Sequence, residues 1–202
     1  MPLYTVIRTM SVAIIKYNAG NIQSVVYALQ RLGLEPLLTD DPEAIRQADK
    51  VIFPGQGEAS SAMRYLRERG LDEVIKGLTQ PVLGICVGLQ LMCRHSTEGD
   101  ADCLGIFDVA VKRFPPDRKV PHMGWNDIQV TGGVLCRDLP DNAYLYYVHS
   151  YYAELSECTT ATNDYILPYS VALEKDNFYA IQPHLEKSGV DGEAILRNFL
   201  AL

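Results

Sequence analysis

Cys86 stands in a pattern of glycines and apolar residues that is typical of a reactive thiol. A strand-length apolar run ends at this cysteine, with Gly84 two residues before it and Gly88 two residues after it, and a helix-compatible run begins at once. Glycine-x-cysteine-x-glycine between strand and helix is the thiol form of a nucleophile elbow, because only glycine fits beside so sharp a turn. The N–H groups and positive dipole end of the following helix favour a thiolate. The alternative is a structural cysteine buried in a hydrophobic strand.

A thiol also needs a base and a group that orients the base. His184 and Glu186 supply both residue types, and they directly follow the apolar run 178–182. In an extended segment, side chains two residues apart leave the same face, so Glu186 would hold one ring nitrogen while the other faces Cys86. The alternative is a surface histidine beside a solvated Glu–Lys pair.

The first half of the chain alternates between strand-like and helix-like segments with short connections. Strands are predicted at 12–15, 36–38 and 51–53 and in the run that ends at Cys86; helices are predicted at 22–32, from 42, at 59–69 and at 71–78. This alternation predicts a mostly parallel sheet flanked by helices, with ligands bound beyond the carboxyl ends of the strands. The loops 17–21 and 54–57 and Cys86 all lie at those ends, so we expect them to converge.

The pattern changes between about residues 104 and 173. Short β-like pieces such as 127–130 and 144–148 are separated by Gly, Pro, Asn and Asp, and 131–133 is typical of a hairpin turn. We therefore expect a smaller, partly antiparallel β section within the same domain, followed by a helix that Asp191 caps. Residues 10–202 are expected to form one domain, and residues 1–9 are expected to be an extension, disordered or produced by a misplaced start.

Composition excludes several classes of protein. The net charge of −7 disfavours a broad nucleic-acid surface, and no apolar stretch approaches the roughly 18 residues of a membrane span. The five cysteines are odd in number and widely spaced, which argues against a disulfide framework or a zinc site and favours a reducing cytoplasm. The sequence has no clear secretory signal and gives no sign of a metal or organic cofactor.

Three motifs together resemble the class I (triad) glutamine amidotransferases. They are Pro54-Gly55-Gln56-Gly57, Gly84-x-Cys86-x-Gly88-x-Gln90 and Gln182-x-His184-x-Glu186-Lys187-Ser188, in the order of that family. The resemblance spans residues 12–202 and implies a flavodoxin-like α/β fold that hydrolyses glutamine and passes ammonia to a synthase. It implies that Cys86, His184 and Glu186 are the catalytic residues. Pro183 and Leu185 replace the usual Phe and Pro, which leaves the alignment of His184 with Cys86 open.

The same resemblance assigns two further sets of residues. It implies an oxyanion hole formed by the N–H of Val87 and an N–H from the loop Gly55, Gln56 and Gly57. It implies substrate contacts from Gly57, Gln90, Ser150 and Tyr151. Taken alone, Gln90 could equally be a polar residue on a half-exposed helix. Gly55 and Gly57 would permit a peptide flip that completes the hole only when a partner docks.

A narrower resemblance comes from the strings 18–21, 121–126 (Pro-His-Met-Gly-Trp-Asn) and 147–152. They are similar to the glutaminase subunits of imidazole glycerol phosphate synthases in histidine biosynthesis. This implies a heterodimer with a cyclase subunit, a (β/α)₈ barrel that uses the ammonia to convert PRFAR to imidazole glycerol phosphate and AICAR. It places Asn18, Trp125, Tyr146 and Lys187 at or near the interface, although Trp125 could instead be a core residue.

Three alternatives remain open at this point. One is a glutaminase subunit that serves another synthase, such as one for vitamin B6, purine or anthranilate. Another is a cysteine peptidase or other hydrolase with the same fold. The third is a non-catalytic, flavodoxin-like binding protein with a vestigial triad.

Overall fold

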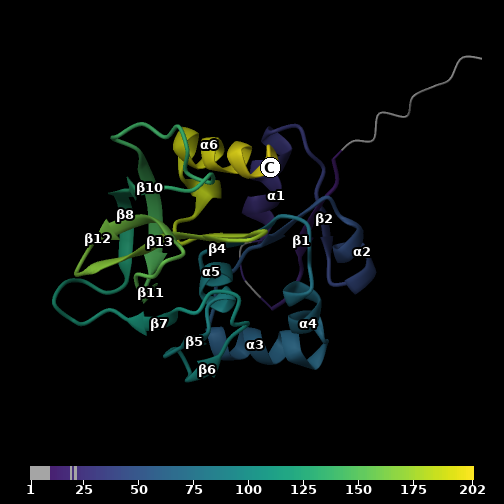
Figure 1. Cartoon of the computed structure of the whole chain (residues 1–202), viewed down its shortest axis with the longest axis horizontal. Coiled ribbons are helices and arrows are strands. Elements are labelled where there is room, and N and C mark those ends of the chain that lie inside the picture. Colours follow the sequence, from purple (N-terminus) through teal and green to yellow (C-terminus); the bar gives the residue numbers. More distant parts are fainter. Residues whose placement is uncertain (1–9, 19, 21) are drawn as a thin grey trace, which may run out of the picture.

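The computed structural model describes residues 10–18, 20 and 22–202 (Figure 1). The predicted extension 1–9 lies outside the described residues. Five parallel strands form one half of the main sheet, and they lie in the order β2 (Leu37–Thr39), β1 (Val12–Ile15), β3 (Lys50–Phe53), β4 (Val82–Ile85) and β14 (Phe178–Ile181). Every residue of β1, β3 and β4 is buried, as expected for a parallel sheet covered on both faces. The predicted mostly parallel sheet is therefore confirmed.

Helices cover both faces of these strands (Figure 1). On one side lie α1 (Ile22–Arg31) and α6 (Gly189–Leu200); on the other lie α3 (Ala59–Glu68), α4 (Leu71–Lys76) and α5 (Val87–Met92). The short α2 (Pro42–Gln47) begins as predicted, because the Asp41 carboxylate accepts the N–H of Glu43 at 3.1 Å. Among the described residues, no helix has the length and apolar character needed to cross a bilayer.

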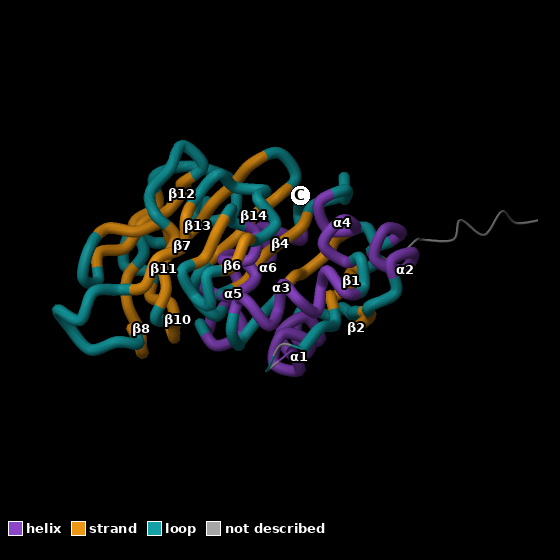
Figure 2. Tube along the Cα trace, turned by 90° about the horizontal axis from the view of Figure 1, so that it is seen from below, coloured by secondary structure: helices purple, strands orange, loops and turns teal. Residues whose placement is uncertain are grey.

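Beyond β14 the sheet continues with mainly antiparallel pairs. Its strands here are β13 (Pro168–Lys175), β11 (Tyr151–Ala153), β7 (Ala110–Arg113), β5 (His95–Ser96) and β6 (Ala101–Asp102), with β12 (Thr159–Asp164) and β9 (Gln129–Val130) pairing beside β13. A separate antiparallel pair is formed by β8 (His122–Asp127) and β10 (Tyr144–His149). Figure 2 shows most of these strands gathered at one end of the molecule. The expected smaller β section is present.

Two local predictions in this section are wrong. The predicted strand 127–130 is divided between β8 and β9, and 131–133 does not close a hairpin, because β9 pairs with the distant β12. A side chain from far along the chain also determines the path of the segment after Gly133. The Glu174 carboxylate accepts the N–H groups of Val134 at 2.9 Å and Leu135 at 2.8 Å, and this holds the segment after Gly133 out of strand geometry.

The start of α6 also differs from the prediction. Ser188, not Asp191, occupies the position before the helix, and Asp191 lies in its first turn. The Asp191 carboxylate accepts the N–H of Tyr144 at 2.9 Å, so it links α6 to β10 instead of capping the helix. The helix packs its apolar side inward, with Ile195, Leu196 and Phe199 buried.

Candidate active site

Cys86 occupies a strained turn between β4 and α5. Its backbone has φ 55° and ψ −109°, a conformation that residues with a side chain rarely adopt. A Cβ atom at Gly84 would lie 2.9 Å from the carbonyl carbon of Gly88, and one at Gly88 would overlap the carbonyl oxygen of Phe53. Both neighbouring glycines are therefore required by close packing, and the predicted elbow is present.

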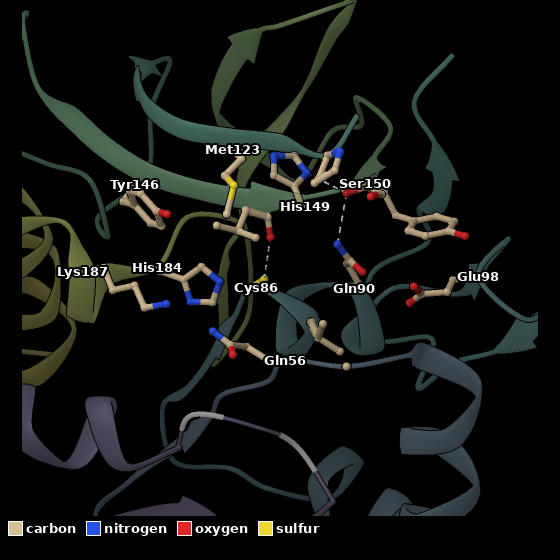
Figure 3. Close-up of a pocket in the computed structure, with 15 residues that line it drawn as sticks. Gln56, Cys86, Gln90, Glu98, Met123, Tyr146, His149, Ser150, His184 and Lys187 are labelled. Atoms are coloured by element: carbon tan, nitrogen blue, oxygen red, sulfur yellow. Dashed lines mark hydrogen bonds between the residues drawn. The ribbon is translucent and has the colours of Figure 1, made fainter. Parts of the chain in front are cut away.

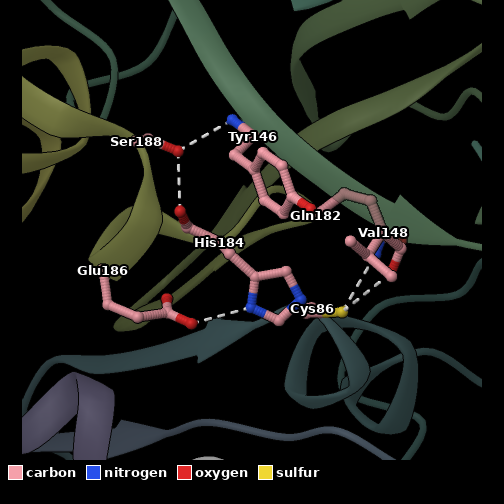
Figure 4. A network of polar contacts seen from close by, with 7 residues as sticks. All are labelled: Cys86, Tyr146, Val148, Gln182, His184, Glu186 and Ser188. Atoms are coloured by element: carbon pink, nitrogen blue, oxygen red, sulfur yellow. Dashed lines mark hydrogen bonds and ion pairs between the residues drawn. The ribbon is translucent and has the colours of Figure 1, made fainter. Parts of the chain in front are cut away.

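The sheet brings His184 and Glu186 to the same edge as Cys86. β4 and β14 are neighbours, and the N–H of Cys86 donates to the carbonyl oxygen of Ile181 at 2.8 Å. The ring of His184 lies between the other two side chains (Figure 4). Its Nδ1 lies 2.8 Å from Oε1 of Glu186, and the side chains of both residues are 3% exposed or less. The structure thus brings all three predicted triad residues together.

Charge interactions determine the protonation of His184. Burial lowers the pKa of its imidazole, but the hydrogen bonds and opposite charges of Cys86 and Glu186 outweigh burial and raise that pKa to about 10. The imidazole of His184 is therefore protonated at neutral pH. Oε2 of Glu186 is buried without a hydrogen-bond partner among the described residues, so Oε1 carries the carboxylate's hydrogen bond to the imidazole.

The backbone around His184 is not the extended segment that the sequence suggested. Residues Leu185–Lys187 form a turn of 3₁₀ helix, in which the N–H of Lys187 donates to the carbonyl oxygen of His184 at 3.0 Å. His184 also donates its N–H to the carbonyl oxygen of Tyr146 at 2.9 Å, and its carbonyl oxygen accepts the Ser188 hydroxyl at 2.6 Å (Figure 4). Pro183, which lacks an N–H, is buried beside these contacts without disturbing the alignment of the ring.

A pocket of about 410 Å³ opens beside Cys86 (Figure 3). All four residues predicted to contact substrate line it: Gly57, Gln90, Ser150 and Tyr151. Gln90 is not half-exposed but buried, and its side-chain N–H groups donate to the carbonyl oxygen of Tyr151 and to Oε1 of Gln182, each at 3.1 Å. Its interpretation as a polar residue on a half-exposed helix is therefore wrong, and its contact with substrate stays a prediction.

Two residues near the sulfur were given no role in the sequence analysis, although Gln182 stands in the motif that contains His184. Glu98, in the turn between β5 and β6, lines the pocket and accepts the N–H of Ala59 at 2.9 Å. Burial raises the pKa of its carboxyl group. Gln182 is fully buried and donates to the Cys86 sulfur at 3.6 Å. The sequence did not predict either contact, because Ala59 and Cys86 lie far from Glu98 and Gln182 along the chain.

The predicted oxyanion donors have a different arrangement in this structure. The N–H of Val87 donates to the carbonyl oxygen of Gly55 at 3.4 Å, so this loop presents a carbonyl, not an N–H, to the start of α5. The next carbonyl, that of Gln56, accepts the N–H of Gly20 at 3.0 Å. Gly57 has φ 134°, which only glycine adopts easily.

The predicted partner-facing residues form a surface next to the pocket, with one exception. Trp125 is 55% exposed, so its interpretation as a core residue is wrong. Its ring packs edge-on against Tyr146 with centroids 6.0 Å apart, and Lys187 Nζ lies 5.8 Å from the Tyr146 ring. Asn18 is the exception, because it lies after β1 and its side chain donates to the carbonyl oxygen of Ser61 at 3.4 Å.

Comparison with known proteins agrees with this geometry. The family model of the class I glutamine amidotransferases matches residues 13–202. The chain belongs to the class I glutamine amidotransferases. Among solved structures, a glutamine amidotransferase superposes with a TM-score of 0.71 at 19% identity over 94% of this chain and 97% of its own. The structure of PurLQS from Thermotoga maritima gives 0.72 at 15% identity over 95% and 97%.

More similar sequences carry a more specific name. A Bacteroides thetaiotaomicron protein named imidazole glycerol phosphate synthase subunit HisH is 59% identical over 96% of this chain and 100% of its own length. The Escherichia coli protein of the same name is 43% identical over the same shares. The chain thus has the flavodoxin-like α/β fold of glutamine amidotransferases, as predicted, and is an enzyme of that family.

Proposed function

We propose that this amidotransferase is the glutaminase subunit of an imidazole glycerol phosphate synthase. The observation that carries the proposal is the buried Cys86–His184–Glu186 arrangement, which opens into a pocket beside an exposed aromatic surface. The names of the similar proteins from Bacteroides thetaiotaomicron and Escherichia coli supply the specific synthase.

The reaction follows from the charges of the triad. The Cys86 thiolate attacks the side-chain carboxamide of glutamine, and the protonated His184 gives its proton to the departing ammonia. This leaves a glutamyl thioester on the sulfur. His184, now neutral, takes a proton from water, whose oxygen attacks the thioester and releases glutamate. Glu186 holds the ring in one orientation throughout, and the net change is glutamine plus water to glutamate plus ammonia.

The pocket offers contacts for the rest of the substrate. Glu98 lines the same pocket as Cys86 (Figure 3), and its carboxylate would attract the α-ammonium group of glutamine. Gln90, Ser150 and Tyr151 would supply polar contacts to the other end of the amino acid. A peptidase is the weaker alternative, because the carboxylate of Glu98 would pair with the free α-ammonium group of an amino acid, which a residue within a peptide lacks.

The loop of residues 54–57 would regulate the reaction. With the Gly55 carbonyl on the Val87 N–H, the developing oxyanion has no free donor from this pair. Rotation of the Gly55–Gln56 peptide would remove the carbonyl and present the N–H of Gln56. One such donor contributes about 10²–10³ in rate in other enzymes. We propose that docking of the cyclase drives this rotation, so that ammonia is released only when a consumer is present.

The surface around Trp125 is the proposed docking site for the cyclase barrel. Trp125 and Met123 are both largely exposed, and large aromatic residues are favoured anchors of protein interfaces. This surface borders the pocket through Tyr146 and Lys187, so a partner seated there would cover the route by which ammonia leaves. Covering the route matters because ammonia is protonated in bulk water.

The deciding experiment is a glutaminase assay of the chain alone, with the cognate cyclase, and with the cyclase plus PRFAR. We expect slow hydrolysis alone and strong stimulation by cyclase plus PRFAR, with all activity lost in Cys86→Ala. Stimulation by the synthase of another pathway in place of this cyclase would contradict the assignment. Cleavage of peptides without release of ammonia from glutamine would favour a hydrolase.

A further inference from the structure

Gln182 contacts the reactive sulfur, although nothing in the triad description includes it. This residue directly follows β14, and its backbone N–H donates to the carbonyl oxygen of Val171 at 2.8 Å. Its side chain is 0% exposed. The amide nitrogen lies 3.6 Å from Cys86 Sγ (Figure 4). The amide oxygen accepts an N–H from Gln90 at 3.1 Å. Both ends of the amide are therefore used.

The direction of this amide is determined by its neighbours. Gln90 donates from Nε2 to the carbonyl oxygen of Tyr151, which can only accept. Gln90 must therefore present its NH₂ group on this side, and the same group faces Gln182. Gln182 can meet that donor only with its oxygen, so its own NH₂ group points to the sulfur. A reversed amide would place two donors together at one end and an oxygen against a thiolate at the other.

The carbonyl oxygen of Tyr151 also ends a second chain of hydrogen bonds, in which each donor and acceptor can be assigned. His149 Nδ1 donates to the Tyr151 oxygen at 2.8 Å, which leaves His149 Nε2 as an acceptor for His122 Nδ1 at 3.2 Å. His122 Nε2 then accepts the side-chain N–H of Asn126 at 3.3 Å. The orientation of Asn126 is set by its oxygen, which accepts the N–H of Asp127 at 3.0 Å. This sequence requires both histidines to be neutral.

The protonation of the pair agrees with that requirement. Burial lowers the pKa of His122 to about 4 and that of His149 to about 3. At neutral pH neither ring carries a second N–H that would reverse the chain. The carbonyl oxygen of Tyr151 therefore accepts hydrogen bonds from both His149 and Gln90, and it fixes the orientation of the Gln90 amide.

Besides His184, two polar groups contact the sulfur of Cys86, and they favour opposite protonation states of the thiol. The carbonyl oxygen of Val148 lies 3.9 Å from Sγ, and a carbonyl there is favourable only to the thiol form. The Gln182 N–H is favourable mainly to the thiolate, because hydrogen bonds to charged acceptors are about twice as strong as neutral ones. Other titratable groups around the sulfur are Glu186, behind His184, and the buried Tyr17 hydroxyl, whose pKa is raised by burial and by Cys86.

We propose that Gln182 is a further residue of this catalytic site: it donates a hydrogen bond to the Cys86 thiolate and is aimed by the chain Tyr151–Gln90–Gln182. Its effect on glutamine turnover rests on the proposed function, whereas its effect on the thiolate does not. The thiolate contact is made from the same strand end that carries His184, so both groups reach the sulfur from β14.

The test measures the rate at which iodoacetamide alkylates Cys86 between pH 5 and 10, with the modified peptide identified by mass. Gln182→Met keeps the volume of the side chain and removes its N–H. We expect the midpoint of the rate profile to rise by about one pH unit, so that alkylation is about tenfold slower at pH values below both midpoints. In a separate assay, kcat of the cyclase complex should fall. The control is Ser170→Ala in the adjoining strand β13, because it removes a buried hydrogen bond from Ser170 to the carbonyl oxygen of Glu154.

An unchanged midpoint in folded Gln182→Met would overturn the proposal. Because that variant could fail to fold, the wild-type protein provides a second measurement. The side-chain ¹⁵N–H signals of Gln182 should shift with the same pH midpoint as alkylation, and signals that ignore this midpoint would also overturn the proposal. Glutamine and cyclase are absent from the alkylation and NMR measurements. A shifted midpoint without glutaminase activity would therefore reject the proposed function alone.

Discussion

The carbonyl oxygen of Gly55 lies 3.4 Å from the backbone nitrogen of Val87 and accepts its hydrogen bond. Behind this contact, the buried hydroxyl of Tyr17 donates to the carbonyl oxygen of Pro54 at 2.6 Å. The loop is thus held from two sides in a state that blocks one oxyanion donor. Small changes in the loop should consequently affect rate far more than substrate binding.

The substitution Gly55→Ala should obstruct this loop. The new Cβ would overlap the Tyr17 hydroxyl and lie 3.0 Å from Val87 Cβ. We expect a loss of about 1–3 kcal/mol in the free energy of unfolding, as for other overpacked sites. Removing the overlapping oxygen with Tyr17→Phe should recover part of this loss in the double variant. Additive effects of the two substitutions in urea unfolding would show that the clash is absent.

Glu186→Gln should leave the fold intact and impair the base. An amide that donates to Nδ1 of His184 would place the ring proton on the nitrogen facing Cys86, where it cannot accept the thiol proton. We expect kcat of the cyclase complex to fall by about 10² or more, since the corresponding change in serine proteases costs about 10⁴. Full activity in this variant would show that the 2.8 Å contact does not set the tautomer.

The same variant should change the pH dependence of stability. The pKa of His184 is raised to about 10, against about 6.5 in an unfolded chain, so its stabilisation is fully present below pH 6.5 and is lost as pH rises toward 10. Removing the carboxylate lowers the folded-state pKa. The loss should then occur at lower pH in Glu186→Gln, which urea midpoints measured from pH 6 to 10 would reveal. Parallel curves for the two proteins would contradict the assignment of Glu186 as a source of the raised pKa.

The parallel half of the fold was predictable because its signals are local. Buried parallel strands are continuous apolar runs, and the run 12–15 was placed with the same bounds that β1 has in the structure. The second half was not predictable in detail. The pairing of β9 with β12 and the capture of the 134–135 backbone by Glu174 both depend on residues far apart in the sequence.

The same division applies to the candidate site. The elbow at Cys86 and the pair His184 and Glu186 have compact patterns of their own. Glu98 has no such pattern, because only the pocket that it lines marks it. Gln182 stands in the motif of His184, but its role was not predictable, because its amide contacts Gln90 across 92 positions. The 3₁₀ turn after His184 was also missed, since its hydrogen bonds to Tyr146 and Ser188 come from tertiary packing.

The strain at Cys86 predicts an inverted order of stability between two inactive variants. Cys86→Gly and Cys86→Ala both lose the sulfur, but only glycine accepts φ 55° and ψ −109° without a steric cost. We expect the glycine variant to be more stable by about 1 kcal/mol in thermal or urea unfolding. The control is Cys93, a buried cysteine with φ −70°, where alanine should be the more stable replacement. If the alanine variant were the more stable one at both Cys86 and Cys93, the backbone at Cys86 would not be strained.

The buried pair His122 and His149 should make the protein sensitive to acid. Their pKa values are lowered by burial to about 4 and about 3, whereas an unfolded histidine titrates near 6.5. The unfolded state therefore binds more protons between these values, and stability falls as pH drops below about 6.5. We expect each ring to cost about 2 kcal/mol between pH 6.5 and 5.

Replacing one ring separates this effect from the acid sensitivity of carboxylates. His122 stacks between Tyr147 and Tyr165, with ring centroids 4.8 and 3.9 Å away, so His122→Phe keeps the aromatic packing and removes one titrating group. This variant should be less stable than the wild type at pH 7, because Asn126 loses an acceptor. Its further loss of stability between pH 6.5 and 5 should nevertheless be smaller by about 2 kcal/mol. An equal loss in both proteins would show that His122 already binds its proton in the folded state, which would break the directed chain that reaches Tyr151.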